Sequence, residues 1–229
     1  MGFVIAVDGP AGSGKSSVCR GVARTLGYRY LDTGAMYRAI TWAVLQAGID
    51  PNDPTGVAAF AESPTIDSGM DPQAPTIRAN GVDVAEAIRG EQVTSAVSAV
   101  SAVPAVRERL VQMQRAAAAR AAADGVGIVV EGRDITTVVL PDADLRIFLT
   151  ADPAVRALRR ALEQGEADPT AVAAAQEAMA RRDALDSTRD ASPLTQSDDA
   201  TVVDTTTMTL DEVIAHVCAM VPTSRETAR

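Results

Sequence analysis

The sequence has 229 residues, of which 47% are hydrophobic, and its 21 basic and 30 acidic side chains give a formal net charge of −9. A chain of this length and apolar content suffices for one globular domain or for a core with insertions. The acidic balance argues against a surface that coats nucleic acid, although it leaves room for a local arginine pocket that binds one small anion.

The chain has too few cysteine and histidine residues for a zinc site or a catalytic cysteine paired with a histidine. The cysteines, Cys19 and Cys218, are far apart and belong to no C-x-x-C pair or other metal-ligand pattern. The only histidine, His216, lies in an apolar stretch near the end of the sequence. We therefore expect neither a zinc site nor a catalytic cysteine. No apolar run reaches the length of a membrane helix, so we expect a cytoplasmic protein.

The first predicted strand, at residues 4–7, leads into the strongest motif of the chain. Residues 9–16, here called the phosphate loop, fit the pattern G-x-x-x-x-G-K-[ST], and a helix-compatible stretch follows. Such a strand, loop and helix wrap backbone N–H groups around a polyphosphate at the positive end of the helix. The residues expected to bind the phosphates of a nucleotide are Gly9, Pro10, Ala11, Gly12, Ser13, Gly14, Lys15, Ser16 and Ser17.

Lys15 is the only lysine in the chain, and the other 20 basic residues are arginines. A compact ammonium group fits between phosphate oxygens inside a tight backbone loop, where a planar guanidinium needs more room. The composition therefore supports a specific role for Lys15 on the outer phosphates.

Strand and helix signals then alternate in the way that gives a parallel sheet with helices on both faces. This pattern predicts an α/β fold with a five-stranded, P-loop NTPase-like sheet. Thr33 is the predicted N-cap of the second helix. The predicted strands are residues 4–7, 28–31, 127–130, 145–149 and 201–203, and the predicted helices are residues 16–26, 34–46, 104–123, 153–164 and 210–220.

Residues 51–89 break this alternation, because the segment is rich in Pro, Asp and Gly and carries a hairpin signal at Asn80-Gly81. We expect a small β-containing insertion here, between core segments at residues 1–50 and 90–229. A second interruption, at residues 165–169, separates two arginine-bearing helices. Insertions at the strand ends of such a sheet commonly close over ligands.

Four stretches in this order resemble the bacterial cytidylate (CMP) kinases. Besides the phosphate loop they are LDTGAMYR at residues 31–38, EGRD at residues 131–134 and R-x-x-x-D-x-x-R at residues 182–189. The phosphate loop alone is shared by many NTPases, whereas the four together are specific. The resemblance covers nearly the whole chain, and it is weakest in residues 51–89. It implies a five-stranded parallel core, a monophosphate-binding insertion at residues 51–89 and a mobile lid within about residues 156–186.

The family implies ATP as the phosphate donor, Mg²⁺ as the metal, and CMP and dCMP as the acceptors. Arg156, Arg159 and Arg160 resemble the lid residues that cover the ATP phosphates. By the same resemblance the acceptor would be bound by Thr33, Arg38, Ser98, Arg107, Arg133, Asp134, Arg182, Asp186 and Arg189, and the residues at the transferred phosphoryl group would be Lys15, Arg133, Arg159 and Arg189.

Two of these groups also fit a structural role. Arg156, Arg159 and Arg160 share one helical face, and such charge runs are typical of a solvated surface. Arg182 and Asp186, which by resemblance bind the sugar hydroxyls, also fit an i, i+4 ion pair.

Ser16 has two possible roles toward a metal. In the usual phosphate loop the hydroxyl at this position binds Mg²⁺. Many relatives in this kinase group carry glycine there, and the ion is then held mainly by phosphates and water.

The chemistry of phosphoryl transfer agrees with this inventory, because it needs in-line placement and neutralisation of charge and little else from the protein. A nucleoside monophosphate is already an anionic nucleophile near pH 7, so no general base is needed. A kinase for a small-molecule hydroxyl would instead use a carboxylate as the base, and Asp32 or Asp134 could serve. That activity is the first alternative.

The second alternative is a nucleotide-dependent switch or binding module. Guanine-reading GTPases use N-K-x-D, which this chain lacks because its only lysine lies in the phosphate loop. An ATP-dependent interaction module stays open. We expect a monomer whose partners are nucleotides, with no nucleic acid and no membrane among them.

For the base, the resemblance implies Ser98, Arg107 and Asp134. Cytosine offers acceptors at O2 and N3 and a donor at its amino group. An arginine can donate to the first two while a carboxylate or hydroxyl accepts from the third, so the trio is complementary to cytosine. Ser95, Ser98 and Ser101 recur along one segment, and any of them could be the reader.

Overall fold

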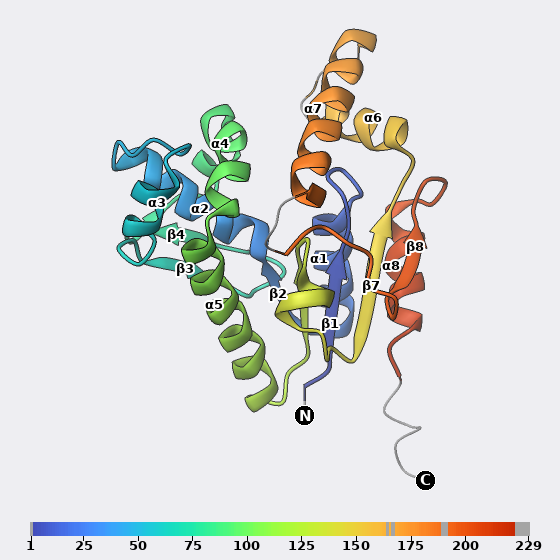
Figure 1. Cartoon of the computed structure of the whole chain (residues 1–229). Helices are drawn as coiled ribbons and strands as arrows, with labels where there is room; N and C mark the ends of the chain where they lie inside the picture. The colour runs from blue at the N-terminus through green and yellow to red at the C-terminus, as the bar shows by residue number, and fades with distance from the viewer. Residues whose placement is uncertain (1, 164, 166–167, 189–191, 223–229) are drawn as a thin grey trace.

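The computed structural model describes residues 2–163, 165, 168–188 and 192–222 (Figure 1). This part of the chain contains a five-stranded, fully parallel sheet with the strand order β2-β6-β1-β7-β8. The predicted α/β fold and all five predicted strands are confirmed. The strands are β1 (Val4–Asp8), β2 (Arg29–Asp32), β6 (Ile128–Glu131), β7 (Leu145–Thr150) and β8 (Thr201–Asp204).

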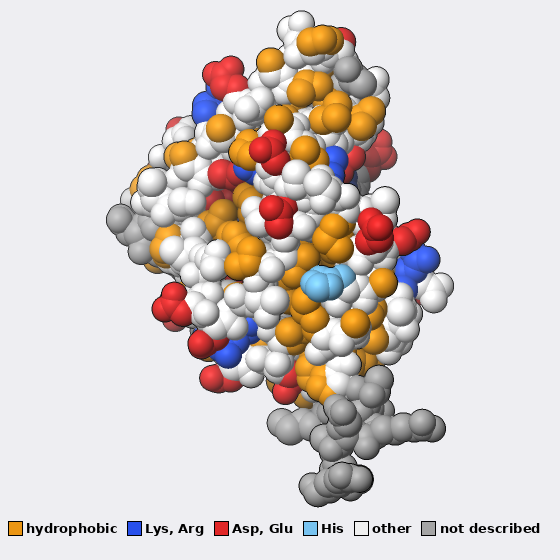
Figure 2. All heavy atoms as spheres, turned by 90° about the vertical axis from the view of Figure 1, so that its right-hand side faces the viewer, with side chains coloured by type: hydrophobic (Ala, Val, Ile, Leu, Met, Phe, Trp, Pro, Cys, Tyr) orange, Lys and Arg blue, Asp and Glu red, His pale blue; other side chains and the backbone are white. Residues whose placement is uncertain are grey.

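Both faces of the sheet are buried, which explains the nearly continuous apolar composition of its strands. Helices α1 (Lys15–Leu26) and α8 (Leu210–Ala219) cover one face, and α2 (Thr33–Gln46) and α5 (Pro104–Ala123) cover the other. His216 lies on the exposed side of α8, in the view of Figure 2. None of the described helices combines the length and the apolar character that a membrane crossing needs.

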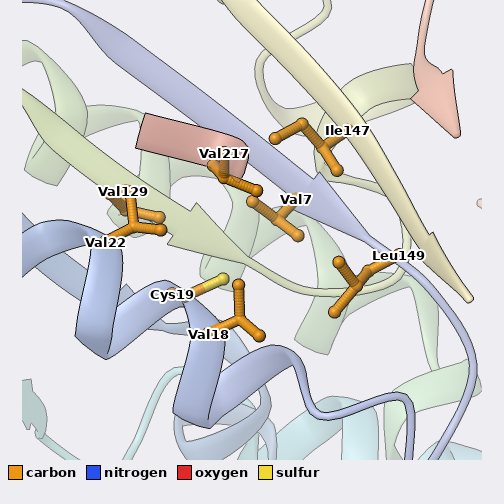
Figure 3. A pocket seen from close by; sticks show the side chains of 8 residues that line it. All are labelled: Val7, Val18, Cys19, Val22, Val129, Ile147, Leu149 and Val217. Carbon is orange, nitrogen blue, oxygen red and sulfur yellow. The ribbon is translucent and has the colours of Figure 1, made fainter. Parts of the chain in front are cut away.

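Apolar side chains pack the start of α1 against the sheet (Figure 3). Cys19 lies among them, and burial raises the pKa of its thiol, which agrees with a core side chain rather than a reactive one. The space between these side chains has no room for a water molecule. Because α1 begins at Lys15, this packing holds the phosphate loop in place. The side chains are Val7, Val18, Cys19, Val22, Val129, Ile147, Leu149 and Val217.

The predicted helix bounds need small corrections. Asp32, and not Thr33, is the N-cap of α2: its side chain accepts a hydrogen bond from the backbone nitrogen of Ala35 at 2.9 Å. Thr33 is the first residue of the helix instead. Helix α8 begins with a capping box in which Thr209 and Glu212 bond reciprocally.

The segment at residues 51–89 contains the predicted hairpin, with Asn80 and Gly81 both at positive φ between β4 (Ile77–Ala79) and β5 (Val82–Asp83). Strand β3 (Ile66–Ser68) completes a three-stranded antiparallel sheet.

Sequence reasoning missed α3 (Pro54–Phe60), the 3₁₀ turn at Ala87–Arg89 and α4 (Glu91–Ala102). Buried apolar side chains of α3, β3 and β4 belong to the same cluster as those of α2, α4 and α5. The segment therefore shares its core with the helices beside it.

Helices α6 (Pro153–Glu163) and α7 (Pro169–Thr188) pack against each other above the carboxyl ends of the strands (Figure 1). A single π-helical turn at Ile135–Val139, also missed from the sequence, follows β6. The carboxyl ends of β1, β2 and β6 thus meet the phosphate loop, α7 and this π-turn, which places the predicted motifs at one end of the sheet.

The first prediction concerns the core under the phosphate loop. Leu149→Ala should lower the free energy of unfolding by about 2–5 kcal/mol, because Leu149 is fully buried and the substitution leaves a cavity. Leu162→Ala is the matched control, since this leucine of α6 is 58% exposed, and it should cost at most about 0.5 kcal/mol. Urea unfolding curves measure both values. Equal losses would show that the Leu149 site is not packed as described.

Candidate active site

The phosphate loop joins the carboxyl end of β1 to the amino end of α1. Gly14 precedes the helix in a left-handed conformation with φ of 84°. Gly9 has φ of 150°, and a Cβ there would lie 2.0 Å from the carbonyl oxygen of Leu149 on β7, so the close approach of two strands requires glycine. The first N–H groups of α1 have no partners within the helix and form its positive end. The loop therefore has the local geometry of an anion site.

The Lys15 side chain folds into this loop. Its Nζ donates hydrogen bonds to the carbonyl oxygens of Gly9 at 2.7 Å and Pro10 at 2.8 Å, and it lies 3.5 Å from Ser13 Oγ. Burial, and after it the positive charge of Arg133, lower the pKa of the ammonium from 10.5 to about 7. A negative ligand beside Lys15 would reverse this shift.

Asp8, the last residue of β1, holds the turn that follows β6. Its fully buried carboxylate accepts from the backbone nitrogens of Ile135 at 2.9 Å and Thr136 at 2.7 Å, and from Thr136 Oγ1 at 2.7 Å. Burial raises the pKa of Asp8, and these bonds favour its charged form. Asp8 thereby fixes the backbone immediately after Arg133 and Asp134.

Glu131 lies opposite Val7 in the register of β1 and β6, beside the phosphate loop. Tyr30 donates its hydroxyl to Glu131 Oε1, and Ser16 also bonds to this carboxylate. Burial, and after it the charge of Asp32, raise the pKa of Glu131 to about 7. Sequence reasoning assigned Glu131 no role. The available signal was an acidic residue that ends a buried strand directly before Arg133.

Thr33 is one of the predicted acceptor-binding residues. It is buried, and its hydroxyl donates to the carbonyl oxygen of Glu131 at 2.7 Å. It ties the ends of β2 and β6 together.

Arg133 links the phosphate loop to α7. Its Nη1 donates to the carbonyl oxygen of Gly9, and its Nε donates to Asp186 Oδ2 at 2.9 Å. Burial, and after it the charge of Arg133, lower the pKa of Arg182, whose Nε has no hydrogen-bond partner in the described part of the chain. Asp186 thus pairs with Arg133 across the site. Arg189 lies outside the described residues.

Arg38 brings another positive charge from α2. Its Nη1 donates to the carbonyl oxygen of Ile88 and to Thr94 Oγ1, both at 2.9 Å. Burial, and after it the charge of Arg182, lower the pKa of Arg38 to about 10. Arg38 and Arg182 therefore repel each other in a partly desolvated region, a repulsion that a bound anion would relieve.

Arg107 and Asp134 form a nearly fully buried ion pair through Nη2 and Oδ2. Nη1 of Arg107 donates to the carbonyl oxygen of Ser101 at 3.1 Å, and the guanidinium lies 5.4 Å from the centre of the Tyr37 ring. Nε of Arg107 has no hydrogen-bond partner among the described residues. A buried arginine with an unused donor is suited to a polar ligand edge.

The three serines of α4 differ in what their hydroxyls do. Ser95 donates to the carbonyl oxygen of Gln92 at 3.0 Å, and Ser101 donates to that of Ser98 at 3.1 Å. The half-buried Ser98 makes no side-chain hydrogen bond within the described residues. Of the three hydroxyls, that of Ser98 is the one open to a ligand.

The three arginines predicted to share one face of α6 bond to different parts of the structure. Arg156 reaches the phosphate loop, where its Nη1 donates to the carbonyl oxygen of Ala11 at 2.8 Å. Arg159 instead bonds to Thr205, after β8, at 2.9 and 2.7 Å. Arg160 pairs with the exposed Glu163 at 3.2 Å. In this structure only Arg156 of the three contacts the loop, because a helical face spreads long side chains in several directions.

The oxygen atoms beside the phosphate loop suit Mg²⁺. The Ser16 hydroxyl and the Glu131 carboxylate provide oxygen ligands of the kind that this ion prefers. The described residues contain no group of three or more His, Cys, Asp or Glu side chains placed to hold a metal.

A phosphate loop with one lysine, faced by arginines from α2, α5, α6, α7 and the end of β6, is the arrangement of a P-loop kinase, which moves a phosphoryl group between two bound anions. The profile of the cytidylate kinase family matches residues 5–223. The chain belongs to this family of nucleoside monophosphate kinases.

Relatives support the assignment. The cytidylate kinase of Streptomyces avermitilis is 55% identical over 222 residues, covering 97% of this chain and 94% of that one. The cytidylate kinase of Mycobacterium avium is 52% identical over 230 residues, covering 99% and 98%. Among solved structures, TT1252 from Thermus thermophilus aligns over 97% of this chain and 99% of that chain, at 17% identity and a TM-score of 0.48, a likeness that carries no functional information.

The second prediction follows from the lowered pKa of Lys15. At pH 8 a group with a pKa of about 7 is mostly neutral, and bound phosphates should recharge it, so an ATP analogue should bind with uptake of nearly one proton. The uptake should fade as the pH falls through about 7, because the ammonium is then already charged.

Calorimetric titrations in two buffers of different ionisation enthalpy measure this uptake. Glu131, whose pKa burial also raises to about 7, can take up part of the proton, and a Lys15 variant separates the two contributions. Lys15→Met should remove most of the uptake, because the ammonium that is recharged is then absent. The same uptake in wild type and in Lys15→Met would contradict the assignment.

Proposed function

We propose that the protein transfers the terminal phosphoryl group of ATP to CMP, and to dCMP, giving ADP and the diphosphate by direct in-line transfer. The observation that carries the proposal is Arg133, which bonds the phosphate loop at Gly9 and Asp186 of α7 at once. It thus lies between the loop that suits a triphosphate and the arginines that suit a monophosphate.

On the donor side, the loop glycines supply N–H groups, and Lys15 supplies the charge for the outer phosphates. Arg156 adds a guanidinium at Ala11. The fit of Ser16 and Glu131 to Mg²⁺ supports these two residues as its protein contacts, and the bound ion neutralises phosphate charge. Residues 9–17 hold and orient the donor.

On the acceptor side, Arg38 and Arg133, with Arg189 by resemblance, supply positive charge for the monophosphate, and Arg182 adds charge beside the sugar hydroxyls that it is expected to bind. The lowered pKa values of Arg38 and Arg182 support this role, because both reflect burial near other cations. By resemblance to the family, Asp186 would exchange Arg133 for a sugar hydroxyl when the phosphate binds.

At the base, Arg107, Asp134 and Ser98 form the complementary set. Within the described residues, Nε of Arg107 and the hydroxyl of Ser98 make no hydrogen bond, and both could therefore bond to the base. Uracil reverses the donor and acceptor at positions 3 and 4, so each mismatch should cost about 1–3 kcal/mol and CMP should be preferred over UMP by tenfold or more.

The hydroxyl-kinase alternative loses support from two contacts. Its candidate bases are Asp32, which caps α2, and Asp134, which is paired with the buried Arg107. Both carboxylates are therefore engaged. A monophosphate acceptor needs no base, in agreement with the exposed position of His216 on α8.

Closure would complete the site. Residues 51–89 and the lid formed by α6 and α7 should move together over the two nucleotides and exclude the water that would otherwise accept the phosphoryl group. We further propose a monomer that acts on small nucleotides in the cytoplasm.

The third prediction tests the reaction itself. Wild type with ATP and CMP should form diphosphate in equal amount to the ATP consumed, and release little inorganic phosphate without an acceptor. Lys15→Ala and Lys15→Arg should both lower kcat severely, since Lys15 Nζ sits within 2.8 Å of two loop carbonyls and a guanidinium does not fit there. Phosphate release without CDP would indicate a switch instead. Activity of Lys15→Arg within a few-fold of wild type would refute the fit argument.

The fourth prediction tests the base. Asp134→Asn should lower kcat/KM for CMP more than for UMP and narrow their ratio by about tenfold, because a charged acceptor for the cytosine amino group is lost. Steady-state kinetics with both substrates measure the ratio, and thermal unfolding checks that the variant folds. Equal losses for CMP and UMP would mean that Asp134 serves Arg107 and the fold rather than the base.

A further inference from the structure

Both backbone polar groups of one residue of the phosphate loop, Ala11, are hydrogen-bonded by the lid helices. Its backbone N–H donates to Asp183 Oδ1 at 2.9 Å, and its carbonyl oxygen accepts from Arg156 Nη1 at 2.8 Å. The same Nη1 pairs with Asp183 Oδ2 at 2.7 Å. One ion pair between α6 and α7 therefore bonds both backbone groups of one loop residue.

This contact is partly buried and closely packed. The side chains of Arg156 and Asp183 are 11% and 18% exposed. A Cβ on Gly12 would lie 2.8 Å from Met179 Cε of α7 and 3.2 Å from the carbonyl oxygen of Arg156, so the two helices press against the loop. An ion pair in such a place needs all its hydrogen bonds, because each charge has lost water.

Helix α7 also carries a solvent-exposed ion pair, in contrast to the partly buried pair of Arg156 and Asp183. Glu177 and Arg181 are 73% and 64% exposed and contact no part of the loop in the described residues. Such a pair contributes little to stability or position. Glu177 therefore serves as the control for an acidic residue of α7 that lies in solvent.

We propose that Asp183 is a positioning residue for the donor nucleotide: it fastens Arg156 and α7 to Ala11, so that closure of the lid sets the conformation of the phosphate loop. This proposal rests on the proposed function, because it assigns the loop to the donor. Asp183 touches no substrate itself and acts through Arg156 and the backbone N–H of Ala11.

The coupling is reciprocal. If the closed lid favours the loop conformation that holds the donor, then the donor must favour the closed lid by the same free energy. The contacts of Arg38, Arg107 and Asp134 do not involve Ala11 or Arg156, whereas Arg182 and Asp186 share α7 with Asp183. The effect of Asp183 should therefore fall mainly on the donor, and saturating ATP, which favours the closed lid, should restore the acceptor side.

The experiment compares Asp183→Asn with Glu177→Gln. Each removes one charge from α7 at nearly constant size, and thermal unfolding without nucleotide confirms that both variants fold. Asp183→Asn should raise the dissociation constant of a non-hydrolysable ATP analogue by about tenfold and leave KM for CMP at saturating ATP within about twofold. It should also abolish the extra hydrogen-exchange protection that the analogue confers on residues 168–188. Glu177→Gln should behave as wild type in all three measurements.

Three results would overturn the proposal. Tighter binding of the analogue by Asp183→Asn would show that the carboxylate competes with phosphate for Ala11 and Arg156. A parallel rise for ATP and CMP would show a general effect on the fold. Unchanged binding would show that the contact does not position the loop. Failure of the proposed function would appear separately, as wild type that makes no CDP, while analogue binding would still report on Asp183.

Discussion

The constraint on which this site depends is the mutual repulsion of its cations. The lysine of the phosphate loop and arginines from several elements are packed at one end of the sheet, and the lowered pKa values of Lys15, Arg38 and Arg182 record the strain of burial among like charges. The protein limits this repulsion by pairing cations with carboxylates: Arg107 with Asp134, Arg133 with Asp186, and Arg156 with Asp183. Such pairs contribute little to stability, and their value lies in holding positive charge ready for phosphates.

The sheet supplies the rigid frame for this arrangement. Because β1 lies between β6 and β7, the end of β1 is surrounded by parallel strand ends, and Gly9 turns against the backbone of Leu149 where no side chain fits. Asp8 fixes the backbone that follows Arg133, and Glu131 bonds to Ser16 at the start of α1. Stability in the core and precision in the site come from the same strands.

Helix α7 connects the two halves of the proposed reaction. Asp183 faces the donor loop, and Asp186, one turn later, faces Arg133 at the acceptor side. A helix with carboxylates on both sites can respond to both nucleotides. That arrangement offers a physical route by which closure depends on the presence of donor and acceptor together, and so limits wasteful hydrolysis.

The sequence by itself determined the elements whose signals are local: the strands, the phosphate loop and its lysine, the hairpin at Asn80-Gly81, and the family motifs with their arginines. Helices α3 and α4 escaped it, because α3 has only seven residues and α4 lies in a stretch rich in Ser and Val, with no side chain that caps its start. Only the tertiary structure decided which partner each arginine takes, and it placed Glu131 and Asp183 beside the phosphate loop. Asp183 contacts Ala11 across 172 positions of sequence, and no local pattern encodes such a contact, since it depends on how two helices pack over the end of a sheet.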